Sequence, residues 1–117
     1  QKNVKILKDI GNFTLEQMVK VLAEMKEEDP NFSGFLQFIR DWYRDVLIVL
    51  VGADVRKLIF STEMKTMKEK AEQYSLTKVN QILEAVDLAQ DRIQANVKAE
   101  LAMQMLLMEM KVGEDNG

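Results

Sequence analysis

The stretch FLQFIRDWYRDVLIVLVG, from Phe35 to Gly52, carries the clearest structural pattern in the chain. Polar residues recur every three to four positions through its first half, which is the spacing of one stripe on an α-helix. Six apolar residues then follow, from Val46 to Val51. We therefore expect one long helix that is capped by Ser33 and ends at Gly52, where glycine can adopt the left-handed conformation.

The second half of this helix lacks a polar stripe, so we expect it to be buried on all sides at the centre of a helical bundle. The buried face is predicted to consist of Leu36, Ile39, Trp42, Tyr43, Val46, Leu47 and Leu50. Water is expected to solvate the polar stripe, which consists of Gln37, Arg40, Asp41, Arg44 and Asp45. In an alternative interpretation, Arg44 and Asp45 pair with a neighbouring subunit.

Helical periodicity continues on both sides of this stretch. Thr14 and Gln17 form a capping box in front of a helix that ends before Pro30. Further helices are predicted over Thr62 to Tyr74, from Ser75 to Asn96, and after Asn96, while residues 54–60 are expected to form a short helix rather than a loop. No apolar run alternates in the manner of a strand. The sequence thus predicts an all-α fold, a compact bundle of five to six helices.

A chain of 117 residues with 47% apolar composition is enough for one hydrophobic core. We expect residues 13–112 to form a single helical domain. Residues 1–12 are interpreted as the end of a preceding segment or a linker helix, because the apolar pattern begins there without a cap. Residues 113–117 are expected to form a disordered tail.

Composition argues against several kinds of chemistry. The net charge of −3 gives no general attraction for nucleic acid, and the absence of His and Cys removes the commonest metal ligands and nucleophiles. The glycines stand apart, so no phosphate-binding loop is expected, and we predict that the chain neither binds nor hydrolyses ATP. No catalytic residue, cofactor or metal site is predicted. The densest carboxylates are interpreted as a solvated helix end: Glu24, Glu27, Glu28 and Asp29.

The longest apolar run has far fewer than the ~18 residues of a membrane span, so we expect a soluble, cytoplasmic protein without membrane contact. The last predicted helix is different, because methionine and leucine leave it few polar positions. Its apolar arc is wider than one core contact requires, and methionine-rich helices adapt well to partners. The candidate outward face for subunit contact consists of Met103, Leu106, Leu107 and Met110.

Two of these segments carry a resemblance to a known family. FLQFIRDWYRDVLIVLVG is similar to the signature helix in the C-terminal domain of the bacterial DNA polymerase III delta-prime subunit. LAQDRIQANVKAELAMQMLLMEM, from Leu88 to Met110, resembles the last two helices of that domain and the Asn-led turn between them. The similarity extends from about Ile10 to Met110. The related clamp-loader ATPase subunit has a comparable last helix and is an alternative, although Trp42-Tyr43-Arg44-Asp45 favours delta-prime.

The resemblance implies a collar domain, in which helical domains of several clamp-loader subunits join in a pentameric ring that loads the sliding clamp onto DNA during replication. It implies no catalytic residue, cofactor, small-molecule substrate or direct nucleic-acid contact in this part of the protein. The full-length protein would belong to a DNA polymerase holoenzyme, with its DNA-directed DNA polymerase activity. Two other classes stay open: a free-standing dimeric helical adaptor or regulator, and a carboxylate metalloenzyme.

Overall fold

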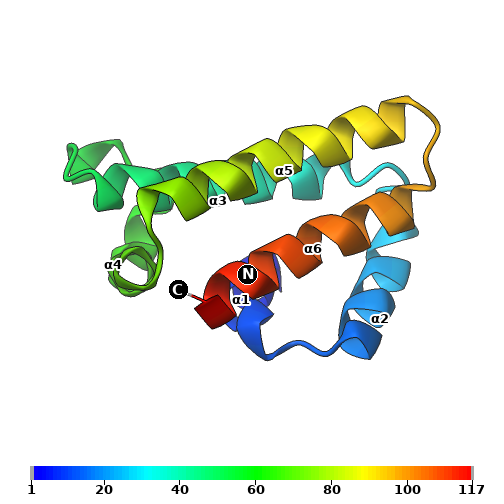
Figure 1. Cartoon of the computed structure of the whole chain (residues 1–117), viewed down its shortest axis with the longest axis horizontal. Helices are drawn as coiled ribbons and strands as arrows, with labels where there is room; N and C mark the ends of the chain where they lie inside the picture. The colour runs from blue at the N-terminus through cyan, green and yellow to red at the C-terminus, as the bar shows by residue number, and fades with distance from the viewer. Residues whose placement is uncertain (1, 117) are drawn as a thin grey trace.

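A computed structural model describes the backbone of residues 2–116 and the side chains of residues 2–113. Its α-helices are α1 (Lys2–Asp9), α2 (Leu15–Lys26), α3 (Ser33–Leu50), α4 (Met64–Gln73), α5 (Leu76–Gln94) and α6 (Ala99–Asn116) (Figure 1). Three short 3-10 turns join them: η1 (Ile10–Asn12), η2 (Val55–Lys57) and η3 (Ser61–Glu63). The described residues contain no strand. The all-α fold predicted from the sequence is confirmed.

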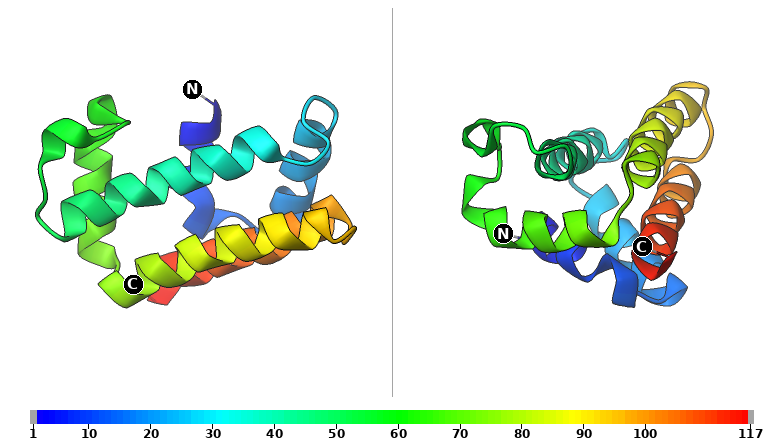
Figure 2. Two further views of the ribbon diagram at one scale, coloured as in Figure 1. Left: turned by 90° about the horizontal axis from the view of Figure 1, so that it is seen from above. Right: turned by 60° about the vertical axis from the view of Figure 1, so that its left-hand side comes forward.

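The helices surround one core. α5 and α6 form an antiparallel pair, and α3 packs on α5 on one side and α4 on the other (Figure 2). α2 packs against α6, close to the turn that joins α5 to α6, while α1 contacts α3 and leads through η1 to α6. The molecule therefore places α6 between the N-terminal segment, α2 and α5.

The predicted core face of α3 is confirmed for five of its residues, because Leu36, Ile39, Trp42, Tyr43 and Val46 are buried. Leu47 and Leu50 are only half-buried and pack at the margin of the core. The expectation that the second half of the helix is buried on all sides is wrong for residues 47–50.

The path of the chain after α3 accounts for the partial exposure of the last turn. The segment that follows the helix folds back over one side of it. Phe60 packs on Phe38 and Trp42, with ring centroids 5.0 and 5.4 Å away. At the C-terminal end of the helix, Val51 is 57% exposed. The buried side chains of α3 therefore lie between Phe35 and Val46, and the last turn of the helix lies at the margin of the core.

Most of the predicted helix ends are confirmed. Thr14 Oγ1 accepts a hydrogen bond from the backbone N–H of Gln17 at 3.1 Å, and the Gln17 side chain accepts one from the Thr14 N–H at 2.8 Å. Ser75 Oγ accepts from the Lys78 N–H at 3.1 Å at the start of α5. Gly52 has a φ of 72°, the left-handed value expected after α3.

Ser33 is not the cap of α3, as the sequence suggested. The Asp29 carboxylate instead accepts hydrogen bonds from the N–H groups of Ser33 and Gly34, at 3.1 and 3.0 Å. The residue before the helix is Phe32, which is fully buried and left-handed, with a φ of 55°. With the Phe32 ring buried and its backbone left-handed, the Asp29 side chain lies at the start of α3. Asp29 therefore caps the free N–H groups of the first turn, which the Ser33 side chain does not.

The N-terminal segment belongs to the same core, which corrects the expected boundary after residue 12. Ile6, Leu7 and Ile10 are buried in the common cluster. Lys111 Nζ donates a 2.7 Å hydrogen bond to the Gly11 carbonyl, so α6 is tied directly to this segment. At the other end, α6 continues through Gly113, where a disordered tail was predicted, as far as Asn116. Gly117, the last residue of that predicted tail, lies outside the described residues.

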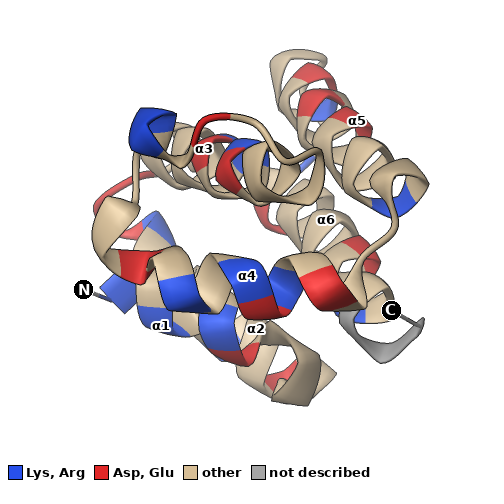
Figure 3. Ribbon diagram, turned by 90° about the vertical axis from the view of Figure 1, so that its left-hand side faces the viewer, with Lys and Arg blue, Asp and Glu red and all other residues tan. Residues whose placement is uncertain are grey.

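The region between α3 and α5 is close to the expectation. The predicted short helix over residues 54–60 is reduced to the single turn η2. Charged positions run along α4 (Figure 3). Met67 and Lys70 are buried, whereas Lys65, Lys68, Glu69 and Glu72 are exposed. η3 and α4 lie beside α1, and Lys8 Nζ is 2.7 Å from Glu63 Oε1.

Candidate protein-interaction groove

Helix α6 has two apolar faces that point in opposite directions. The inward face packs into the core and consists of Ala102, Met103, Leu106, Leu107 and Met110. Each of these side chains is no more than 2% exposed. The four residues that the sequence analysis placed at a subunit interface are all on this face. That assignment is therefore corrected, because α2, α5 and η1 already cover these side chains within one chain.

The outward face of α6 carries an apolar stripe formed by Leu101, Met105, Met108 and Val112. Their exposed fractions are 49%, 43%, 39% and 37%. The spacing of i, i+4, i+7 and i+11 places them in one line along the helix, the arrangement found at helix–helix seams. The excess of apolar surface inferred from the sequence is therefore real, although it lies on the side of α6 opposite to the predicted residues.

Two other helices extend this stripe into a groove of about 520 Å³. Leu88 on α5 and Leu15 at the start of α2 flank it and are 47% and 57% exposed. Apolar side chains form most of its lining, which consists of Leu15, Ala85, Leu88, Arg92, Leu101, Gln104, Met105, Leu106, Met108, Glu109 and Val112. An apolar, elongated and open surface of this kind suits another protein element.

Two charges lie on the α5 side of the groove. Arg92, near the end of α5, lies at the same end as Leu101, whereas Glu109 lies two helical turns further along α6. Neither side chain has an ion-pair partner among the side chains of residues 2–113. The groove therefore presents a positive charge at one end and a negative charge toward the other.

A salt bridge fixes the first turn of α6 to α2 behind the stripe. Lys26 Nζ lies 2.8 Å from Glu100 Oε1. The hydrogen bond from Lys26 lowers the pKa of the Glu100 carboxyl, with the charges of Lys26 and Lys98 adding to the effect and partial burial opposing it. This contact holds the beginning of α6 in register with the end of α2.

Arg44 and Asp45, the other candidates for subunit contact, lie on α3 outside the groove. Arg44 is exposed, but Asp45 is fully buried and does not belong to the predicted wet stripe. Its carboxylate accepts hydrogen bonds from the backbone N–H groups of Ile59 and Phe60 at 3.1 and 2.7 Å. Asp45 is therefore a structural residue that holds the segment after α3 against the helix.

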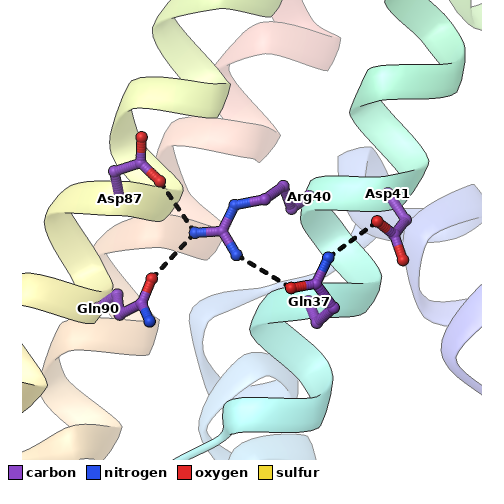
Figure 4. Close-up of polar contacts among 5 residues, drawn as sticks. All are labelled: Gln37, Arg40, Asp41, Asp87 and Gln90. Atoms are coloured by element: carbon purple, nitrogen blue, oxygen red, sulfur yellow. Dashed lines mark hydrogen bonds and ion pairs between the residues drawn. The ribbon is translucent and has the colours of Figure 1, made fainter.

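The remaining polar residues of α3 connect it to α5 (Figure 4). Arg40 Nη2 lies 2.9 Å from Asp87 Oδ1 and 3.0 Å from Gln90 Oε1. Gln37 accepts from Arg40 at 3.4 Å and donates to Asp41 at 2.9 Å, within the same face of α3. The partners on α5 are long-range contacts that the sequence spacing did not indicate. This network orients α5, and with it one wall of the groove.

The four carboxylates that the sequence places together at the end of α2 have different roles in the structure. Asp29 caps α3, whereas Glu24, Glu27 and Glu28 are exposed. No set of three or more His, Cys, Asp or Glu residues within the described part of the chain is arranged to hold a metal ion. Among the described helices, none has the length and apolar character needed to cross a membrane.

Comparisons with known protein families, with curated proteins and with solved structures found no match to this chain.

The groove itself is the feature that the sequence analysis missed. Met105 and Met108 were part of the methionine-rich pattern, but the pattern runs around most of α6. The available signal was the 4-3-4 spacing of Leu101, Met105, Met108 and Val112, which a helical projection separates from the opposite face.

Proposed function

We propose that this chain is a non-catalytic helical assembly domain whose α5–α6 groove binds an apolar helix of a neighbouring subunit. The observation that carries the proposal is the outward stripe of α6, which exposes four large apolar side chains in one line. A helix packed along such a line would bury them in the ridge-and-groove manner of helix pairs. Sequence composition supports the non-catalytic part, since the chain has no His and no Cys.

The resemblance in the sequence gives the proposal its biological setting. We propose that the domain is the collar domain of a delta-prime subunit of the bacterial DNA polymerase III clamp loader. Its partners would be the other clamp-loader subunits, joined in a pentameric ring that places the sliding clamp on DNA in the cytoplasm. The collar domain of the related ATPase subunit is the alternative within this setting. The support consists of the quoted motifs, the all-α fold and the exposed stripe on α6, the helix in which the resemblance ends.

Capture of purified clamp-loader subunits by the immobilised chain tests this proposal. We expect the wild-type chain to retain at least one subunit, and Met105→Glu to lose it, because a carboxylate trapped in an apolar interface is desolvated without a partner. Ile59→Glu is the matched control, since Ile59 is also apolar and 51% exposed but does not line the groove. Circular dichroism would verify that both variants fold.

The possible outcomes test separately whether the groove is the binding surface and whether the partner is a clamp-loader subunit. Equal capture by wild type and Met105→Glu would show that the groove is not the binding surface. Failure of the wild-type chain to retain any clamp-loader subunit would reject the clamp-loader setting. If Ile59→Glu also abolished capture of a subunit, the segment between η2 and η3 would be part of the binding surface.

A further inference from the structure

The outward stripe of α6 is symmetric along the helix. Met105 and Met108 lie on either side of its midpoint, and Leu101 and Val112 lie at equal distances beyond them. A rise of 1.5 Å per residue puts the two outer residues about 16 Å apart. An identical helix laid antiparallel on the stripe would therefore place Leu101 opposite Val112 and Met105 opposite Met108.

The charges of the groove favour the same arrangement. In a helical projection Glu109 and Lys111 fall on opposite sides of the stripe. Glu109 lines the groove together with Ala85 and Leu88 of α5, whereas Lys111 reaches the Gly11 carbonyl. A two-fold axis perpendicular to α6 keeps the α5 sides of both copies on the same edge of the interface. Arg92 of one copy then faces Glu109 of the other, and both pairs form at once.

Axial spacing shows that opposite charges would be nearer than like charges in this arrangement. Arg92 and Leu101 line the same end of the groove, next to the turn that joins α5 to α6. Glu109 of a second copy would lie at the level of Gln104, about 5 Å from Leu101 along the helix axis. The two Arg92 side chains would be separated by about 16 Å along the same direction, and the two Glu109 side chains by about 8 Å. A parallel pair would instead place Arg92 beside Arg92 and Glu109 beside Glu109, which is unfavourable.

We propose that two copies of this chain associate through an antiparallel, two-fold symmetric contact between their α6 grooves. The inference rests on the proposed use of the groove as a protein-interaction surface, and it names a second copy as an occupant. Leu88 of each copy would extend the apolar contact on the α5 side, and Leu15 would flank it on the other. Isologous contacts of this kind close after two subunits, so the product is a dimer and not a filament.

Sedimentation velocity of the 117-residue chain over a concentration series tests the dimer. We expect a monomer–dimer equilibrium for wild type and for Ile59→Glu. Met105→Glu and Met108→Glu should each be monomeric with unchanged helical circular dichroism. The proposal would be overturned if the wild-type chain stayed monomeric at protein concentrations up to about 1 mM, because its dimer dissociation constant would then be weaker than about 1 mM. A dimer that persists in both methionine variants would also overturn it.

A charge-reversal cycle tests the orientation. Arg92→Glu and Glu109→Arg should each raise the dimer dissociation constant by about tenfold, since each reversal replaces two attractive pairs with two repulsive ones. The double variant restores both pairs and should return to within about threefold of wild type. Dimerisation weakened equally by the single and double variants would contradict the pairing of Arg92 with Glu109.

Disulfide trapping gives an independent measure, because the chain contains no Cys. An equimolar mixture of Met105→Cys and Met108→Cys should form the mixed disulfide under mild oxidation in clearly more than the roughly twofold excess over either homodisulfide that random pairing gives. Predominant pairing of Cys at position 105 with itself would indicate a parallel contact and reject the antiparallel one.

These results are separable from those of the proposed function. A chain that is monomeric but binds a clamp-loader subunit in a manner abolished by Met105→Glu would reject self-association and retain the proposed function. A dimer that passes the charge-reversal test but retains no clamp-loader subunit would support the self-association and reject the clamp-loader setting.

Discussion

The carboxylate of Asp45, in the middle of α3, accepts a 2.7 Å hydrogen bond from the backbone N–H of Phe60. The same carboxylate accepts a second bond from Ile59 at 3.1 Å. With these two bonds, one fully buried acid fixes the segment that follows Gly52 and places the Phe60 ring on Trp42. Asp45 therefore ties the segment between η2 and η3 to the core.

Replacement of Asp45 by Ala should destabilise the fold by about 2 to 3 kcal/mol, because charge-assisted hydrogen bonds are lost and buried N–H groups are left without an acceptor. Asp45→Asn keeps one oxygen acceptor and should cost less. Urea denaturation followed by circular dichroism measures both values. Asp91→Ala, at an exposed position on α5, is the control. If Asp45→Ala were no less stable than the control, the anchoring role would be refuted.

Introduction of a charge on the inward face of α6 should unfold the chain. Met103 is fully buried, so Met103→Glu places a carboxylate in the core without a partner and should cost more than about 4 kcal/mol. Met105→Glu, two positions away on the exposed face, should change the free energy of unfolding by no more than about 0.5 kcal/mol in the monomer. Thermal melts at low protein concentration compare the two. Equal melting temperatures would mean that the faces of α6 are assigned incorrectly.

Truncation of Trp42 should be among the most damaging changes in the core. The indole is fully buried and packs in a three-ring cluster with Phe38 and Phe60, whose centroids lie 6.3 and 5.4 Å from that of Trp42. We expect Trp42→Ala to cost about 3 to 5 kcal/mol. Trp42→Phe should cost less, since the indole Nε1 has no hydrogen-bond partner among the described residues and only volume is lost.

Fluorescence provides a second measurement for Trp42, which is the only tryptophan of the chain. Iodide should quench it weakly in the folded protein and strongly in urea. Quenching of the native protein as efficient as that of free tryptophan would contradict its buried position.

The salt bridge between Lys26 and Glu100 should make stability depend on acid pH. The Lys26 hydrogen bond lowers the pKa of Glu100 in the folded chain, so the ionised carboxylate is favoured there. Its contribution is fully present above the ordinary pKa of Glu and is lost as the pH falls through the lowered folded-state pKa. The difference in stability between wild type and Lys26→Met should therefore shrink over that acidic range.

Carboxyl chemical shifts give the direct measurement of this effect. The Glu100 carboxyl should titrate at a lower pH than an unperturbed Glu in wild type, and Lys26→Met should move its pKa upward. An unchanged Glu100 titration in the variant would show that the lowered pKa has another source.

The sequence by itself predicted the parts of the structure that depend on local patterns. The helical period of α3, the capping box of Thr14 and Gln17, the Ser75 cap and the left-handed Gly52 all follow from residues within one or two turns of each other. Such features need no knowledge of neighbouring elements, because their hydrogen bonds and backbone conformations are satisfied locally. The same applies to the excess of apolar residues on α6.

Only the tertiary structure decided which side of each helix faces the core. α6 is apolar on opposite faces, so the sequence could not tell whether the face of Met103 or that of Met105 points to the core. Contacts from α2, α5 and η1 bury Met103 and leave Met105 exposed. Asp45 looked like part of a solvated stripe, yet backbone N–H groups at positions 59 and 60 provide the partners that permit its burial. Whether a helix face is buried depends on residues far away in the sequence. The helical pattern itself does not indicate which neighbouring element will cover that face.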